Sequence, residues 1–166
     1  MLTELTEKRY AFDCGGSRIV LRYDMTAFLR LEERGYSYME IFGESVTGGQ
    51  LCGFLECGAV GGLPEPAENI LRDVGGQALW EHCRRAMALA MPEHDPLVID
   101  IPESPGKPPD MARLRVLVCD IMRKPERFFW RSTLRELLAR WQDFAEIKGY
   151  AKKPERMELY DMEGME

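Results

Sequence analysis

Two short runs of β-strand character flank a pair of glycines near the start of the chain, between Arg9 and Asp24. In the second run, apolar side chains occupy every other position, which is the period of a strand that covers one face of a sheet. The apolar set is Ile19, Leu21 and Tyr23, and it alternates with Arg18, Val20 and Arg22. Gly15-Gly16 tolerates the positive φ of a tight turn, so the sequence predicts a β-hairpin.

Beyond the hairpin, apolar positions recur at helical spacing. The stretch DMTAFLRLEERG predicts a helix that Asp24 caps and Gly35 ends. YSYMEIFGE predicts a second, short helix, and GGQLCGFLECGAVGGL has helical spacing although its many glycines weaken that prediction. Two further helices are predicted in ENILRDV and GQALWEHCRRAMALAMP. The last of these carries one apolar stripe, formed by Leu79, Cys83, Ala86, Met87 and Ala90.

The composition then changes, because residues His94–Asp110 contain five of the ten prolines. We interpret residues 96–110 as a proline-rich linker or loop that follows a hairpin-plus-helices domain at residues 1–95. A C-terminal helical segment is predicted at 111–150, and residues 151–166 form a polar, acidic tail. The predicted fold class is α+β and mainly α-helical, with an N-terminal hairpin, about five to six helices and a C-terminal amphipathic helix.

That C-terminal helix lies in the stretch FFWRSTLRELLARWQDFAEIKGY. We expect Ser132 to be its N-cap, residues 128–130 to form an apolar cluster before the cap, and Glu136 to pair with Arg140 one turn later. One face is apolar and consists of Leu134, Leu137, Leu138, Trp141 and Ala145. Such a face either packs against its own domain or, if exposed, forms a patch that favours association with a partner.

Charge and composition exclude several classes of protein. The net charge of −6 argues against a nucleic-acid binder that works by neutralising phosphates. No apolar run approaches the roughly 20 residues of a membrane span, and the N-terminus lacks the apolar region of a signal peptide. The five cysteines are scattered without a C-x-x-C pair, which predicts reduced and mostly buried thiols. We therefore expect a cytoplasmic protein.

No motif in the chain predicts catalysis, a cofactor or a metal. GESVTGGQ has the glycine spacing of a phosphate-binding loop, but Gly49 and Gln50 stand where that loop needs lysine and a hydroxyl residue. His82 and His94 lack a metal-ligating residue three or four positions later, and no G-x-S-x-G elbow is present. The sequence favours a protein that is not an enzyme, although a site assembled across helices stays an alternative.

The order of these elements resembles the tail assembly chaperones of long-tailed bacteriophages, which have relatives in gene transfer agents. The resemblance begins in IVLRYDMTAFLRLEERGYSYMEIF and GGQLCGFLECGAVGGL. Its matching positions there are Asp24, Ala27, Phe28, Glu32, Ile41, Phe42, Leu55 and Gly58. A C-terminal F-W-x-x-T-x-x-E-L pattern is similar at Phe129, Trp130, Thr133, Glu136 and Leu137.

The resemblance implies a non-catalytic factor of the host cytoplasm that is absent from the mature virion. It implies binding to the tape-measure protein and to tail-tube subunits during tail morphogenesis, with self-association through residues 9–60. The client or tube subunit would contact the C-terminal helix, through Phe129, Trp130, Leu134, Leu137, Leu138 and Trp141. Alternatives are a head–tail adaptor or tail terminator, a small cytosolic enzyme, and an adaptor or regulatory protein unrelated to phages.

Overall fold

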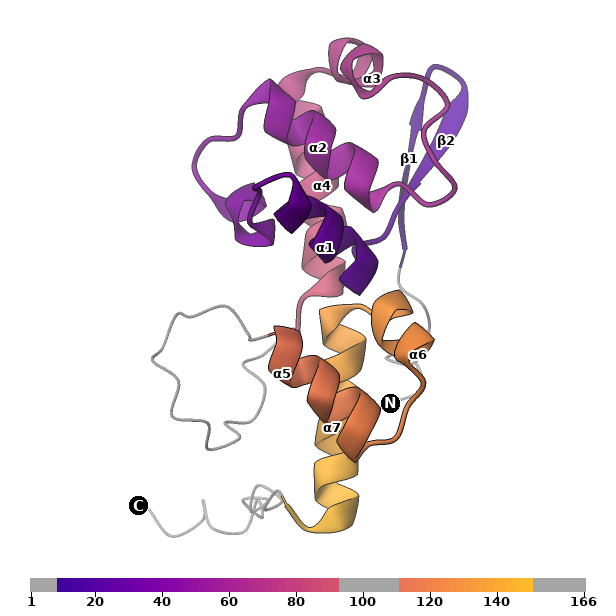
Figure 1. Cartoon of the computed structure of the whole chain (residues 1–166). Helices are drawn as coiled ribbons and strands as arrows, with labels where there is room; N and C mark the ends of the chain where they lie inside the picture. Colours follow the sequence, from indigo (N-terminus) through magenta and orange to yellow (C-terminus); the bar gives the residue numbers. More distant parts are fainter. Residues whose placement is uncertain (1–8, 93–110, 151–166) are drawn as a thin grey trace, which may run out of the picture.

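The computed structural model describes residues 9–92 and 111–150 of the chain. The hairpin and the first helices form one unit, residues 9–92, and the last helices form a second unit, residues 111–150, which lies below it in Figure 1. The fold is α+β and mainly α-helical, as predicted from the sequence. The predictions for His94, for the linker and for the tail lie outside the described residues.

The predicted hairpin is confirmed. Strands β1 (Tyr10–Cys14) and β2 (Ser17–Leu21) pair antiparallel, and the two turn glycines have φ of 56° and 79°. The end of β2 also pairs with residues 58–60. Arg22 N donates to Gly58 O (2.8 Å), and Val60 N donates to Val20 O (2.9 Å). The hairpin is thereby joined to the helical core by backbone hydrogen bonds.

The N-terminal unit contains the helices that the spacing predicts. They are α1 (Met25–Glu33), the 3-10 helix η2 (Tyr38–Phe42), α2 (Gly48–Gly58), α3 (Ala67–Val74) and α4 (Gly76–Ala90). Asp24 caps α1 by accepting a hydrogen bond from Ala27 N, and Gly35 follows the helix with φ of 77°. Every residue of the predicted apolar stripe of α4 is buried.

Helix α2 shows why a glycine-rich stretch forms a core helix. A Cβ atom at position 58 would lie 2.7 Å from ring carbon Cε1 of Tyr23, and one at position 53 would lie 2.6 Å from ring carbon Cε2 of Tyr36. The glycines therefore let two tyrosine rings pack directly on the helix. Thr47 and Gln50 form a capping box at the start of α2. The GESVTGGQ segment is therefore the capped start of a helix, and the element before it is η2 rather than a strand.

The C-terminal unit differs in detail from the prediction. It contains α5 (Met111–Val116), the π-helical turn η3 (Leu117–Ile121), α6 (Glu126–Arg131) and α7 (Leu134–Lys148). The expected apolar cluster before the last helix is itself helical, since residues 128–130 belong to α6. The prediction of Ser132 as N-cap is wrong, because Thr133 caps α7 in a capping box with Glu136, whereas Ser132 Oγ donates to Phe128 O at 2.7 Å.

Buried apolar side chains of both units join in one cluster, to which the C-terminal unit contributes Leu114, Val118, Phe129, Leu134 and Leu137.

The five thiols are free, and all except the half-buried Cys119 are buried, which confirms the cysteine prediction. Burial raises the pKa of the Cys83 thiol to about 12, so this group stays protonated and unreactive. None of the helices in the described ranges has the length and apolar character that crossing a membrane requires.

Candidate partner-binding site and the junction that positions it

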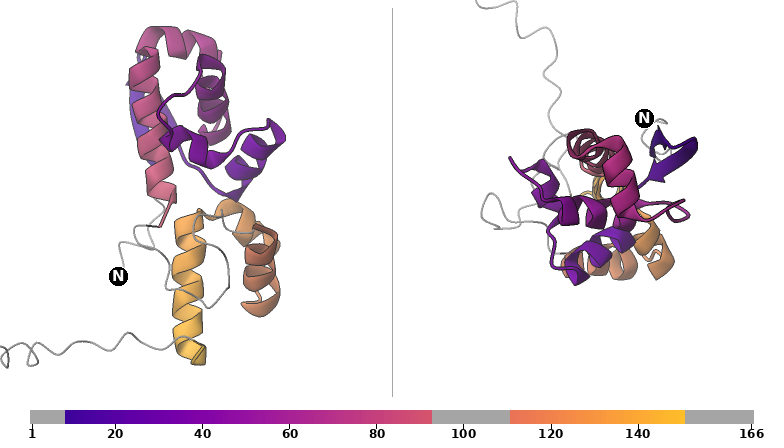
Figure 2. Two further views of the ribbon diagram at one scale, coloured as in Figure 1. Left: turned by 90° about the vertical axis from the view of Figure 1, so that its left-hand side faces the viewer. Right: turned by 90° about the horizontal axis from the view of Figure 1, so that it is seen from above.

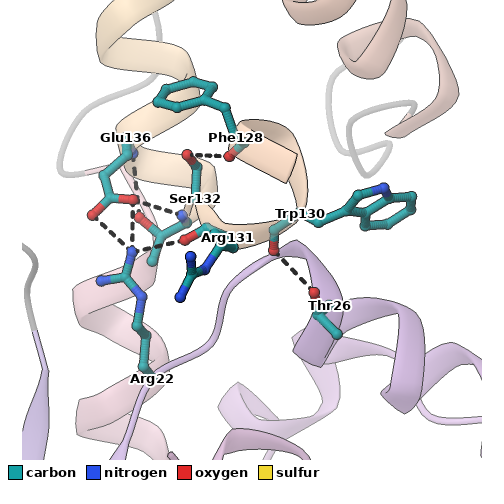
Figure 3. A network of polar contacts seen from close by, with 8 residues as sticks. Arg22, Thr26, Phe128, Trp130, Arg131, Ser132 and Glu136 are labelled. Carbon is teal, nitrogen blue, oxygen red and sulfur yellow. Dashed lines mark hydrogen bonds and ion pairs between the residues drawn. The ribbon is translucent and has the colours of Figure 1, made fainter. Parts of the chain in front are cut away.

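A polar junction between the two units centres on Arg22, just after β2. Its Nη2 atom lies 2.9 Å from Oε2 and 3.1 Å from Oε1 of Glu136, and 3.0 Å from the carbonyl oxygen of Arg131 (Figure 3). The Arg22 side chain is 6% exposed and that of Glu136 is 18% exposed. This ion pair is therefore shielded from solvent, and its loss would leave a buried charge without its partner.

Glu136 connects this ion pair to the start of α7. Its carboxylate accepts a hydrogen bond from Thr133 N at 2.9 Å, while Thr133 Oγ1 accepts one from Glu136 N. The predicted pairing of Glu136 with Arg140 is wrong, because Arg140 lies over the ring of Phe128, 5.0 Å from its centroid. One carboxylate thus both caps α7 and holds Arg22 of the other unit.

Backbone contacts extend the junction on either side. Met25 N donates to Ser132 O at 3.0 Å, and Thr26 Oγ1 donates to Trp130 O at 3.0 Å (Figure 3). On α7, Arg135 Nε donates to Met91 O at 2.6 Å, just after the end of α4. The carbonyls at the ends of α4 and α6 are groups that a helix end leaves unsatisfied, so these contacts complete their hydrogen bonding.

The six residues predicted to bind a partner do not form one free surface. Phe129, Leu134, Leu137 and Trp141 are buried in their own chain, with exposures between 0% and 8%. Trp130 and Leu138 are half-buried and pack against the core from its edge. In this conformation a partner can reach only those last two residues, so the first turns of α7 act mainly as an internal packing element.

Among the described residues, the two most exposed large apolar side chains lie at the far end of α7. Ile147 is 83% exposed and Tyr150, just after the helix, is 71% exposed. Three rings form a row there, with centroids 5.8 Å apart from Trp141 to Phe144 and 6.4 Å apart from Phe144 to Tyr150. The indole N–H of Trp141 is buried and has no hydrogen-bond partner among residues 9–92 and 111–150. We call Phe144, Ile147 and Tyr150 the α7 tip.

This end of the helix projects away from the N-terminal unit (Figures 1 and 2). The sequence stripe could not single it out, because Ile147 and Tyr150 fall outside the apolar face of the helix. The signal that could have found them is the recurrence of large apolar residues at every third position at the end of the helix, Phe144, Ile147 and Tyr150. Exposed large apolar side chains close together at a helix end offer a surface for protein contact.

The family-like motif positions of the N-terminal unit have structural roles. Asp24 is the N-cap of α1, and Ala27 and Phe28 are 2% exposed, while Glu32 lies on the exposed side of the helix. The pKa of the Asp24 carboxyl is raised by burial, an effect opposed by its hydrogen bond from Ala27 and by nearby Arg22. These residues shape the unit, and only Glu32 is open to a partner.

Two other groups of chemically active side chains occur in the described parts of the chain. His82 Nδ1 lies 2.8 Å from the hydroxyl of Tyr10, and its ring stacks on Phe12 at 4.2 Å. Burial lowers the pKa of His82, which favours the neutral ring. Ligand atoms of Cys14, Glu65 and Asp73 gather within 4.8 Å of one another, but the Cys14 thiol has a pKa raised by burial and by both carboxylates, which disfavours the thiolate that binds metal.

Comparisons with protein-family models, with curated proteins and with solved structures give no match to this chain. The resemblance to tail assembly chaperones therefore rests on the order and spacing of the motifs and stays a prediction.

Proposed function

We propose that the protein is a non-catalytic tail assembly chaperone of a long-tailed bacteriophage or prophage. In this role it binds the tape-measure protein and tail-tube subunits in the host cytoplasm while the tail assembles, and it leaves before the virion is complete. The observation that carries the protein-binding part of the proposal is the exposed α7 tip, which extends from a unit fixed in place by the Arg22–Glu136 pair. The phage context comes from the motif resemblance.

The physical reasoning concerns an apolar client. A tape-measure protein is expected to present apolar helices before the tail tube encloses it, and such helices aggregate unless covered. The ring row at the α7 tip offers aromatic area, which contributes strongly to protein interfaces. An acidic chain of net charge −6 keeps the complex from associating further, since like-charged complexes repel each other.

Self-association would use the hairpin. Within the described residues, β2 is the only strand that pairs with β1, so the outer edge of β1 has no strand partner there and offers backbone groups to a strand of a second copy. Light scattering on the purified protein that gives the mass of one chain, at concentrations up to the millimolar range, would exclude this part of the proposal.

The α7 tip can be tested with a client encoded next to this gene. Co-purification of the tape-measure protein should fall at least tenfold in an Ile147→Ser, Tyr150→Ser variant, because these side chains are exposed and their loss leaves the fold intact. Met39→Ser is the matched control, since Met39 is 52% exposed on η2 of the other unit. Equal co-purification by all three proteins would remove the tip from the proposal.

The principal alternative is a head–tail adaptor or a tail terminator. Both are retained in the particle, whereas the proposed chaperone is absent from it. Mass spectrometry of purified virions therefore separates the two, and detection of this chain at ring stoichiometry would favour the alternative.

A further inference from the structure

The junction also borders a solvent-open pocket of about 310 Å³ whose polar wall consists mainly of arginines. Arg9, Arg22, Arg30 and Arg131 line it, together with Asp24 and Thr26. They come from both sides of the junction, because Arg30 belongs to α1 and Arg131 is the last residue of α6. This concentration of positive charge lies in a chain whose net charge is −6.

The charged side chains of this pocket differ in how many contacts they make within the protein. Arg22 is held by Glu136 and by the carbonyl of Arg131, and Asp24 accepts the capping hydrogen bond of α1. Arg30 and Arg131 have exposed side chains, and neither guanidinium makes a hydrogen bond or an ion pair with any residue in the described ranges. Figure 3 shows the Arg131 side chain on the same side of the junction as that of Arg22.

We propose that this arginine pocket binds a phosphate-type oxyanion. Guanidinium groups present paired N–H donors that match the oxygens of phosphate, and two of them at one pocket, on Arg30 and Arg131, suit a ligand that carries more than one negative charge. A volume of about 310 Å³ is at the small end of the range for ligand pockets and leaves room for a phosphate or phosphoryl group. Thr26 adds a hydroxyl at the wall.

The position of the pocket gives the ligand a structural effect. An anion held between Arg30 and Arg131 would attract α1 of one unit and α6 of the other, next to the existing Arg22–Glu136 contact. A ligand that binds only the folded, closed junction stabilises it by mass action. Phosphate would therefore strengthen the attachment of the C-terminal unit, a property that the proposed chaperone role does not include.

Thermal unfolding of the full chain tests this inference, with millimolar inorganic phosphate compared with chloride at equal ionic strength. At about ten times its dissociation constant, phosphate should raise the melting temperature by about 4 °C. An Arg30→Gln, Arg131→Gln variant should lose this rise, whereas Arg84→Gln, an exposed arginine on α4 outside the pocket, should keep it. Since phosphate also stabilises proteins by general exclusion from their surface, only the difference between variants counts.

The inference is overturned if phosphate stabilises the double variant as much as the wild type, or if it has no effect beyond that of chloride on the wild type. Free phosphoserine distinguishes the source of the group: binding of both probes indicates a phosphoryl group on a larger molecule, and binding of inorganic phosphate alone indicates the free ion. Because no client is present in these measurements, their outcome is independent of the chaperone proposal.

Discussion

The junction makes a quantitative prediction when the charge of Glu136 is removed without changing its shape. In Glu136→Gln the new amide can still take part in the capping box with Thr133, since glutamine also serves at this position. The change therefore reports mainly on Arg22, whose side chain is 6% exposed. Removing one partner of a fully buried pair costs about 3–5 kcal/mol.

The expected cost here is smaller than for a fully buried pair. Glu136 is 18% exposed, and Arg22 keeps its hydrogen bond to the Arg131 carbonyl, so we expect Glu136→Gln to lower the free energy of unfolding by about 2 kcal/mol. Arg22→Met should lower the free energy of unfolding much less when Glu136→Gln is already present than it does in the wild type. The double-mutant cycle should therefore give a coupling energy above about 1 kcal/mol.

Equilibrium unfolding in urea, followed by tryptophan fluorescence and circular dichroism, measures these free energies. Glu81→Gln is the control, because the Glu81–Arg85 pair is solvent-exposed and should contribute less than about 0.5 kcal/mol. A cost for Glu136→Gln no larger than that of this control, or a coupling near zero, would refute the view that the pair holds the two units together.

Three further predictions concern the N-terminal unit and the thiols. Gly58→Ala should lower the free energy of unfolding by about 2–3 kcal/mol in urea titrations, because its methyl group would overlap the fully buried ring of Tyr23. In the control Gly49→Ala the new methyl group meets nothing within 4 Å, so the free energy of unfolding should stay within about 0.5 kcal/mol of the wild type. The pKa of His82 is lowered in the folded state below its ordinary value of 6.5. The contribution of the neutral ring to the free energy of unfolding is therefore fully present above pH 6.5 and is lost as the pH falls through the folded-state pKa. In urea titrations, His82→Gln should lose less stability than the wild type between pH 7.5 and 5.5. Ellman's reagent should label Cys119 first in the native protein and all five thiols in urea, and rapid labelling of several thiols under native conditions would contradict the burial of the other four.

The elements predicted from local spacing are those that local interactions determine. The hairpin at Gly15-Gly16, the cap at Asp24 and the apolar stripe of α4 each depend on residues within a few positions of one another, and the structure confirms them. The low helix propensity of glycine made the prediction of α2 a weak one. In the structure, two of these glycines let tyrosine rings from elsewhere in the chain pack directly on the helix. Tertiary packing outweighs propensity there.

The junction could not be predicted because its partners are distant in sequence. Arg22 alternates with apolar residues like a solvent-facing strand residue, yet it is buried against a carboxylate 114 positions later. The same long-range contact explains the wrong pairing of Glu136 with Arg140. Helices α6 and α7 are separated by Ser132 and Thr133, and only Thr133 caps a helix. Both residues carry a hydroxyl group, so the local sequence gave no basis for choosing the N-cap of α7.

The most direct test of the chaperone proposal is the solubility of the tape-measure protein encoded beside this gene. The two proteins would be expressed together and separately, and the fraction of tape-measure protein left in the supernatant after centrifugation would be measured. We expect that fraction to rise several-fold with the wild-type chain, and to rise little with the Ile147→Ser, Tyr150→Ser variant. A tape-measure protein that is equally insoluble with and without the wild-type chain would contradict the proposed function.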